Sequence, residues 1–164
     1  MTLRIRRIDP ETDDIPALLA LILRSFAYMQ GVIDPPSSAF RLTPGTLRQK
    51  ARDEIALLAE VDGTPVGCAF LRPEPGGMYL GKLAVDPDRQ GQGIGQALLA
   101  AVETVAQAHG APRLRLETRA ELTGNHRRFA AWGFVRSGQS SHPGHDRITT
   151  LEMVKPLRSA PGSA

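Results

Sequence analysis

The apolar and polar positions change their period several times along the chain, and each period predicts one kind of element. Apolar and basic residues alternate over residues 3–8, which predicts a strand with one face in solvent. Apolar residues then recur every three or four positions from Leu18 to Met29, which predicts a helix that ends near Gly31. The whole chain read in this way predicts strands at 3–8, 54–60, 65–71, 78–85, 113–118, from 133 onward and at 148–154, and helices at about 14–31, 43–52, 94–110 and 122–132.

Turn-forming residues separate these elements. Asp62-Gly63 is a strong hairpin signal, and proline and glycine residues predict a turn at 73–77. Two consecutive prolines predict a loop at 33–38, and a second loop is predicted at 142–147. Gly81 interrupts its strand, where a glycine indicates a β-bulge or a close approach of another backbone.

The length and the element order together predict the fold class. The 164 residues fit one domain, and 41% of them are hydrophobic, which is enough to bury a core. The order βααβββαβαββ predicts one α/β domain with a mixed, mostly antiparallel sheet flanked by helices. We expect this domain to span residues 1–157 and a disordered tail to occupy residues 158–164.

Several classes of protein are excluded or disfavoured by simple counts. Cys68 is the single cysteine, which excludes an internal disulfide and a multi-cysteine zinc site, and its apolar strand predicts a small core residue. No stretch approaches the roughly 18 uninterrupted apolar residues of a membrane span. Residues 2–7 run into alternation rather than into the apolar core of a signal peptide, so we expect a cytoplasmic protein without membrane association.

The charge balance narrows the class of ligand. The chain has 20 basic and 17 acidic residues, a formal net charge of +3, and only three of the basic residues are lysine. The basic residues are scattered and aromatic residues make up 5%, so we predict no nucleic-acid partner. Arginine binds phosphate and carboxylate groups bidentately, which suits an anionic small molecule, although a solvated arginine-rich surface is the better explanation of most of these side chains.

A glycine-rich segment, Gln-Gly-Gln-Gly-Ile-Gly-Gln at 90–96, lies between a strand and the best helix of the chain. Glycines let backbone amides approach a ligand, and the helix N-terminus adds positive potential, a combination that binds phosphate. No Lys-Ser or Lys-Thr follows, which argues against a P-loop. The G-x-G-x-G spacing and the antiparallel strands before it argue against a dinucleotide-binding unit. On its own the segment is equally compatible with a structural turn.

The wider context is more specific. Residues 83–99 closely resemble the acetyl-CoA motif of the GNAT superfamily of N-acetyltransferases, Q/R-x-x-G-x-G/A, here Gln90-x-x-Gly93-x-Gly95. Residues 129–134 resemble a second signature of that family, an aromatic residue followed by a helix end and Gly-Phe. The resemblance extends from Arg4 to about Leu157. It implies a GNAT-like fold and direct transfer of an acetyl group from acetyl-CoA, a co-substrate, to a primary amine of a small molecule or peptide, without a metal.

The resemblance also implies roles for individual residues. The amides of the glycine-rich segment would hold the CoA pyrophosphate, and the main chain of the preceding strand would pair with the pantetheine arm. The residues implied to bind the cofactor are Leu83, Ala84, Val85, Gln90, Gly91, Gln92, Gly93, Ile94, Gly95, Gln96, Asn125 and Phe129.

Phe129 is a departure from the family pattern. Many relatives carry at this position a tyrosine that protonates the departing CoA thiolate, and phenylalanine has no proton to give. A lost general acid costs about 10²- to 10⁴-fold, but a thiolate with a pKa near 8.5 is a tolerable leaving group. The family's asparagine on this helix has only an approximate counterpart in Asn125. Two interpretations follow: an acetyltransferase, or a CoA-binding regulatory module with weakened catalysis.

Two residues are candidates for proton transfer. Glu117 ends a strand where the cleft is expected to open, so it could accept a proton through water. A surface ion pair of Glu117 with Arg115 or Arg119 is the competing interpretation. Tyr79 could donate a proton or could belong to the core, and its place on a central strand favours the core.

Two further residues are candidates for acceptor binding. Asp34, beside the paired prolines, could attract a cationic amine or could cap a turn. His142 and His145 lie in the penultimate loop, which in this family borders the acceptor site; an H-x-x-H-D cluster could bind a metal, but solvated loop histidines are commoner. Trp132 is expected to pack in the core. The identity of the amine stays open, and so does the oligomeric state, for which a homodimer is one option.

Overall fold

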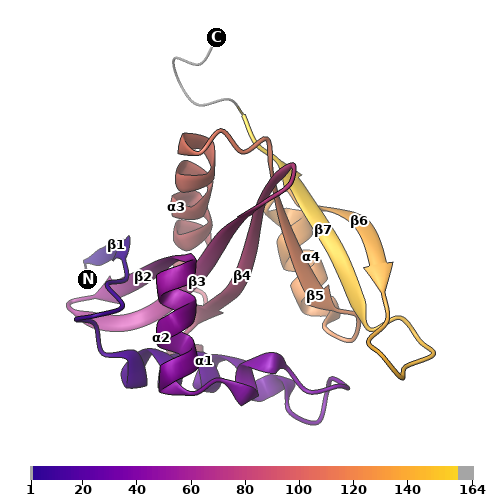
Figure 1. Ribbon diagram of the computed structural model, residues 1–164, viewed down its shortest axis with the longest axis horizontal. Coiled ribbons are helices and arrows are strands. Elements are labelled where there is room, and N and C mark those ends of the chain that lie inside the picture. The colour runs from indigo at the N-terminus through magenta and orange to yellow at the C-terminus, as the bar shows by residue number, and fades with distance from the viewer. Residues whose placement is uncertain (1, 159–164) are drawn as a thin grey trace.

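The computed structural model describes residues 2–158 and has one seven-stranded sheet with helices on both faces (Figure 1). The predicted order of elements is confirmed. The strands are β1 Leu3–Arg7, β2 Ile55–Val61, β3 Thr64–Glu74, β4 Gly77–Val85, β5 Arg113–Arg119, β6 Val135–Ser140 and β7 Thr150–Pro156. The α-helices of the described residues are α1 Ile15–Phe26, α2 Pro44–Asp53, α3 Ile94–Ala108 and α4 Thr123–Ala131. Short 3₁₀ helices lie between these elements at Ala27–Met29, Ser38–Arg41 and Pro87–Arg89.

The strands follow the order β1-β2-β3-β4-β5-β7-β6. Neighbouring strands are antiparallel except for β4 and β5, which are parallel. The mixed, mostly antiparallel sheet that the sequence predicts is therefore confirmed. The parallel pair at the centre divides the sheet into an N-terminal half of four strands and a C-terminal half of three.

The alternation of side chains along the strands builds two separate cores. Leu57 and Leu80 belong to the core under α3, which also contains Leu98 and Val102 of that helix. The opposite face carries a second core under α1 and α2; its members include Leu18, Leu47, Leu58, Cys68 and Phe70. The prediction that Cys68 is a core residue is confirmed, because its side chain is fully buried. Burial also raises the pKa of its thiol to about 12.

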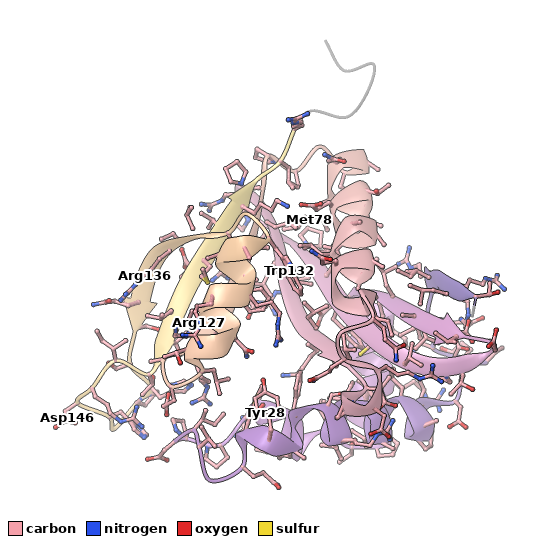
Figure 2. All side chains as sticks on the ribbon, turned by 180° about the vertical axis from the view of Figure 1, so that it is seen from behind. Tyr28, Met78, Arg127, Trp132, Arg136 and Asp146 are labelled. Carbon is pink, nitrogen blue, oxygen red and sulfur yellow. The ribbon has the colours of Figure 1, made fainter. Side chains whose placement is uncertain are left out.

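Helix α4 lies beside α3 on the same side of the sheet (Figure 2). Its residues Phe129 and Trp132 are partly buried against the α3 core, with their ring centroids 5.9 Å apart. Phe129 also packs edge-on against the buried ring of Phe134. Trp132 therefore packs against the core, as predicted, but it lies at the edge of the core and is only partly buried.

Several predicted boundaries were wrong by a few residues. Strand β3 continues to Glu74, so the predicted turn at 73–77 is shorter; β3 pairs with β2 only as far as Leu71, and a proline is tolerated beyond that point. Strand β7 begins at Thr150 rather than at residue 148, because Ile148 is exposed in the preceding loop.

The predictions for the first helix and for the loop after it also need correction. The first helix ends at Phe26 as an α-helix and continues as a 3₁₀ turn over Ala27–Met29. The loop predicted at 33–38 gives way at Ser38 to the 3₁₀ helix Ser38–Arg41, capped by the Ser37 hydroxyl. Of the predicted tail, residues 159–164 lie outside the described residues. Within residues 2–158, no helix is long and apolar enough to cross a membrane.

Candidate functional site

The parallel strands β4 and β5 separate after a short contact. They pair only at Met78 with Leu114 and at Tyr79 with Arg115, and then diverge (Figure 1). From Leu80 onward, the edge of β4 that faces β5 therefore has no strand partner among the described residues. A cleft of about 900 Å³ opens at this divergence. Unpaired backbone groups at such an edge can pair with an extended ligand.

A β-bulge shapes β4 beside the cleft, as the glycine at position 81 indicated. Cys68 of β3 pairs with Ala84 and Phe70 pairs with Gly81, so β4 holds one extra residue between these pairs. Lys82 lies in the bulge with a φ of 49°, which is the left-handed region. The bulge turns residues 82–85 relative to the rest of the strand.

The glycine-rich segment places the N-terminus of α3 at one end of this cleft. Gly93 is the N-cap residue with a φ of 80°, and no side chain caps the helix. The first amides of a helix have no intrahelical acceptor, so they are available to an anion. A phosphate group therefore fits this end of the cleft, where Arg89 and Arg128 also line the wall.

Gly95 serves a different purpose from Gly93. A Cβ atom at Gly95 would lie 3.0 Å from Cη2 of Trp132, closer than side chains normally approach. The missing side chain thus lets the first turn of α3 pack against the end of α4. Residues of both helices line the cleft.

The predicted cofactor residues converge on this cleft with one exception. Gln92 is exposed and does not line it. The predicted residues that do line the cleft are Leu83, Ala84, Val85, Gln90, Gly91, Gly93, Ile94, Gly95, Gln96, Asn125 and Phe129.

Tyr79 lies in the cleft and not in the core that its strand favoured. Its ring is sandwiched between the guanidinium groups of Arg72 and Arg115, whose Cζ atoms are 4.4 and 4.7 Å from the ring centroid. The ring extends over Gly81, where a Cβ atom would lie 3.2 Å from Cε1 of Tyr79. Partial burial raises the pKa of Tyr79, and the nearby carboxylate of Glu117 adds to this effect.

The position of Glu117 is compatible with both interpretations that the sequence left open, a proton acceptor and a surface ion pair. Its carboxylate accepts a hydrogen bond of 2.9 Å from Arg115, and it also lines the cleft. Arg115 in turn binds Glu74 at 2.8 Å and Glu152 at 3.3 Å. This network fixes the position of Glu117 beside the Tyr79 ring.

The two predicted acceptor residues differ in position. His142 lines the cleft, where its amide donates to Thr149 Oγ1 at 2.8 Å, and burial followed by the charge of Arg119 lowers its pKa. Asp34 does not line the cleft: its carboxylate lies 3.4 Å from Nε2 of His145 and 3.9 Å from Arg147. Residues 2–158 contain no group of three or more His, Cys, Asp or Glu side chains that could hold a metal ion.

Sequence reasoning missed Tyr28. Its side chain, in the 3₁₀ helix Ala27–Met29 that follows α1, is 51% exposed, and its hydroxyl accepts a hydrogen bond of 3.1 Å from Asn125 Nδ2. This bond connects α4 to the segment that follows α1, and both residues line the cleft. The chain has two tyrosines, Tyr28 and Tyr79, and both line the cleft. The available signal in the sequence was a tyrosine a few residues before a proline-rich loop.

Sequence reasoning also missed several cations of the cleft. The positively charged side chains in its lining are Arg41, Lys50, Arg72, Lys82, Arg89, Arg119 and Arg128. Arg119 donates to the carbonyl oxygen of Pro36 at 3.1 Å, while its Nη1 atom and Oε1 of the nearby Glu121 are buried without hydrogen-bond partners among the described residues. Burial lowers the pKa of Arg119, and the carboxylate of Glu121, which attracts this charge without direct contact, partly opposes that effect.

The sequence matches known proteins over most of its length. A model described as the acetyltransferase (GNAT) family matches residues 21–134. A mycothiol acetyltransferase from Clavibacter michiganensis subsp. michiganensis is 35% identical over 111 residues, which is 66% of this chain and 33% of that protein. The chain thus spans about a third of the length of this curated relative.

Solved structures share the fold. A paia N-acetyltransferase from Thermoplasma acidophilum, in complex with coenzyme A, has a TM-score of 0.78 and 19% identity, with 96% of this chain and 100% of that chain covered. The ribosomal-protein-S18-alanine N-acetyltransferase from Escherichia coli has a TM-score of 0.74 and 22% identity, with 99% of both chains covered. At these identities the likeness establishes the fold.

Proposed function

The chain belongs to the acetyltransferase (GNAT) family, and on this basis we propose that it transfers an acetyl group from acetyl-CoA directly to a primary amine. One observation carries the proposal: the unpaired edge of β4 and the uncapped N-terminus of α3 open onto the same cleft. A backbone edge binds an extended arm, and a helix N-terminus binds a phosphate. Coenzyme A contains both groups.

The main chain performs most of the cofactor binding in this proposal. Acetyl-CoA supplies the activated acetyl thioester. The amides of residues 91–96, with Gln90 beside them, hold the pyrophosphate, and the edge of Leu83, Ala84 and Val85 holds the pantetheine arm. Asn125 and Phe129 line the opposite wall. Such binding fixes the orientation of the reacting group, which contributes to catalysis by lowering the entropic part of the barrier.

Side chains handle the protons in this proposal. Glu117 accepts the proton of the acceptor ammonium through water, and its ion pair with Arg115 holds it in place. Tyr79 is the proposed proton donor, because it lines the cleft and its hydroxyl is protonated at neutral pH, as that of an ordinary tyrosine is. Burial raises the pKa of Tyr79 further, which makes the hydroxyl a weaker acid. Its ring, held between two guanidinium groups, lies over the strand next to the bulge. Phe129 then needs no hydroxyl.

The acceptor is proposed to be a small-molecule or peptide amine. His142 lines the cleft and is proposed to contact it. The contacts of Asp34 with His145 and Arg147 support an indirect role, in which Asp34 holds the loop after α1 against the loop before β7. We also propose a cytoplasmic location and a homodimer, which cell fractionation and analytical ultracentrifugation test.

The experiment mixes the protein with acetyl-CoA and a panel of primary amines and measures the release of free CoA thiol. A coloured thiol reagent detects the product, and buried Cys68, with its pKa raised to about 12, contributes little background. Thiol release that depends on one class of amine is the expected result. Calorimetric binding of acetyl-CoA without thiol release from any amine would support the alternative, a CoA-binding regulatory module, for which the absence of a hydroxyl at Phe129 is the favouring observation. Absence of binding would overturn the assignment of the cofactor.

A further inference from the structure

The sheet separates the positive charges of the cleft into two groups. Arg89 and Arg128 lie with the N-terminus of α3 and with α4, where the cofactor phosphates are proposed to bind. Lys82 and Arg41 belong to the other side of the sheet, which α1 and α2 cover. The Nζ atom of Lys82 donates a hydrogen bond of 2.9 Å to Ser38 Oγ, in the segment between these two helices. Phosphate groups of the cofactor do not explain this second group.

Lys82 is a partly buried cation without a carboxylate partner. Its position in the bulge of β4 places it next to residues 83–85, which are proposed to hold the pantetheine arm. The Ser38 hydroxyl is its hydrogen-bond partner, and no ion pair of Lys82 occurs within residues 2–158. Burial lowers the pKa of Lys82, and the charge of Lys50 lowers it further.

The surroundings of Lys82 carry an excess of positive charge. Lys50 is paired with Glu54 at 2.5 Å, whereas Arg41 forms no ion pair among the described residues. Three cations thus face one carboxylate around Ser38. Lys50 and Lys82 are partly withdrawn from water, where like charges repel one another more strongly, and the exposed Arg41 adds a third positive charge. A bound anion removes that cost. The Ser38 hydroxyl supplies a further hydrogen-bonding group for such an anion.

The cleft has no free negative charge to receive a polycation. Glu117 is the single carboxylate in its lining among residues 2–158, and it is already paired with Arg115. The second ammonium group of a diamine or polyamine would therefore find no free carboxylate in the lining, and beside Lys82 and Arg41 it would meet positive charge. Such a contact is unfavourable, whereas a negatively charged group in the same place is favourable.

We propose that the acceptor amine carries a carboxylate or phosphate group, and that Lys82 and Arg41 bind this group beside Ser38. This inference rests on the proposed function, because it names the chemical class of the acceptor. It excludes polyamines and other polycationic amines as preferred acceptors. Lys82 and Arg41 act as specificity determinants in this proposal and take no part in the transfer of protons.

The first test measures binding of anions directly. The full-length protein is saturated with CoA, so that its phosphate sites are filled, and is then titrated calorimetrically with inorganic phosphate and with succinate. We expect one of the two probes to bind, which distinguishes a phosphate from a carboxylate site. Lys82→Gln and Arg41→Gln should each weaken that binding at least tenfold. Arg136→Gln, which removes a cation on β6 outside the cleft, should change it less than twofold.

The second test uses pairs of amines that differ in charge: β-alanine and its amide, phosphoethanolamine and ethanolamine, with putrescine as the dication. The anionic member of one pair should have a kcat/KM at least tenfold above its neutral partner, and Lys82→Gln should reduce that ratio to below about threefold. Thermal melting establishes that each variant is folded, and Arg41→Gln, at an exposed residue, provides the second variant.

Several outcomes would overturn this inference. They are failure of both anions to bind the wild-type protein, unchanged binding in Lys82→Gln and Arg41→Gln, or a preference for putrescine over the anionic amines. Failure of the proposed function has a different signature. The wild-type protein would then not bind CoA, or would release no thiol with any amine, whatever the anion titrations give.

Discussion

The two ends of the cleft are built in different ways. The end proposed for the cofactor is built mainly on one continuous segment, residues 83–96, at the edge of β4 and the start of α3, and its proposed contacts are main-chain groups. The end proposed for the acceptor consists of side chains from β4, β5, the loop after α1 and the loop before β7. Backbone atoms are the same in every residue, so the first end tolerates sequence change outside a few glycines. The second end can change its ligand by single substitutions.

The difference also separates the forces that hold each end. At the cofactor end, glycine conformations and the packing of α3 against α4 set the geometry. At the acceptor end, ion pairs and hydrogen bonds set it, above all the bonds of Arg115 to Glu74, Glu117 and Glu152. Substitutions of each kind should therefore affect one end and spare the other.

The largest effect is expected for Gly93→Val. Valine is strained at a φ of 80°, at a cost of about 1–3 kcal/mol, and relief of the strain would move the first amides of α3. We expect acetyl-CoA affinity to fall by about 10- to 100-fold or to be lost, measured by calorimetry.

Gly110→Val is the matched control for this prediction. Gly110 lies just beyond the far end of α3 with a φ of 72°, and a Cβ atom there would have no neighbour within 4 Å. This variant should lose a similar amount of stability and keep its affinity for acetyl-CoA. Equal affinity of the Gly93→Val variant and the wild-type protein would remove the glycine-rich segment from the cofactor site.

A smaller loss of affinity is expected for Gly95→Val. The new side chain would collide with Trp132 and push α4 away from α3, which widens the cleft without straining the backbone. We expect a loss of about tenfold in acetyl-CoA affinity together with a loss of about 1–3 kcal/mol in stability. Gly124→Val, at a helical glycine with open space around it, is the control. Addition of Trp132→Leu should restore part of both losses, and its failure to do so would contradict the steric explanation.

The acceptor end should be sensitive to acid. Hydrogen bonds from Arg115 lower the pKa of Glu74 below its ordinary value. The ionised form therefore contributes stability at neutral pH, and this contribution is lost as the pH falls below about 4 and through the folded-state pKa. Glu74→Gln should cost about 1 kcal/mol at pH 7 in chemical unfolding, and the cost should shrink in acid.

Two further measurements make the test of Glu74 specific. Glu11→Gln, which removes a more exposed pair with Arg52, should have a smaller effect. Acetyl-CoA affinity should be unchanged in Glu74→Gln if the two ends are held separately. A loss of affinity there would show that the ion-pair network also positions the cofactor end.

The smallest effect is expected for Phe129→Tyr. The ring already lies in the cleft wall among Trp132 and Phe134, so acetyl-CoA affinity should change little. If a hydroxyl there assists the departing thiolate, turnover should rise by no more than a few-fold, because CoA thiolate leaves acceptably without a proton. Steady-state kinetics with any accepted amine measures it. A fall of more than tenfold in a folded variant would identify Phe129 as a packing residue of a differently arranged site.

Local patterns in the sequence were sufficient to predict the order of elements, the Asp62-Gly63 hairpin and the glycine-rich start of α3, and they offered the bulge near Gly81 as one of two alternatives. These features depend on the period of apolar residues and on backbone preferences, which act between near neighbours in the chain. Element ends were less predictable: β3 runs through Pro73 because β2 no longer pairs with it there.

The assembly of the acceptor end, by contrast, follows from tertiary contacts. The divergence of β4 from β5 results from the way two parts of a sheet meet, and no local pattern encodes it. The sandwich of Tyr79 between Arg72 and Arg115, and the contact of Lys82 with Ser38, join residues that are far apart in the chain. A single sequence specifies the backbone that carries such side chains, but their meeting depends on strand register and loop path, which many distant contacts settle together.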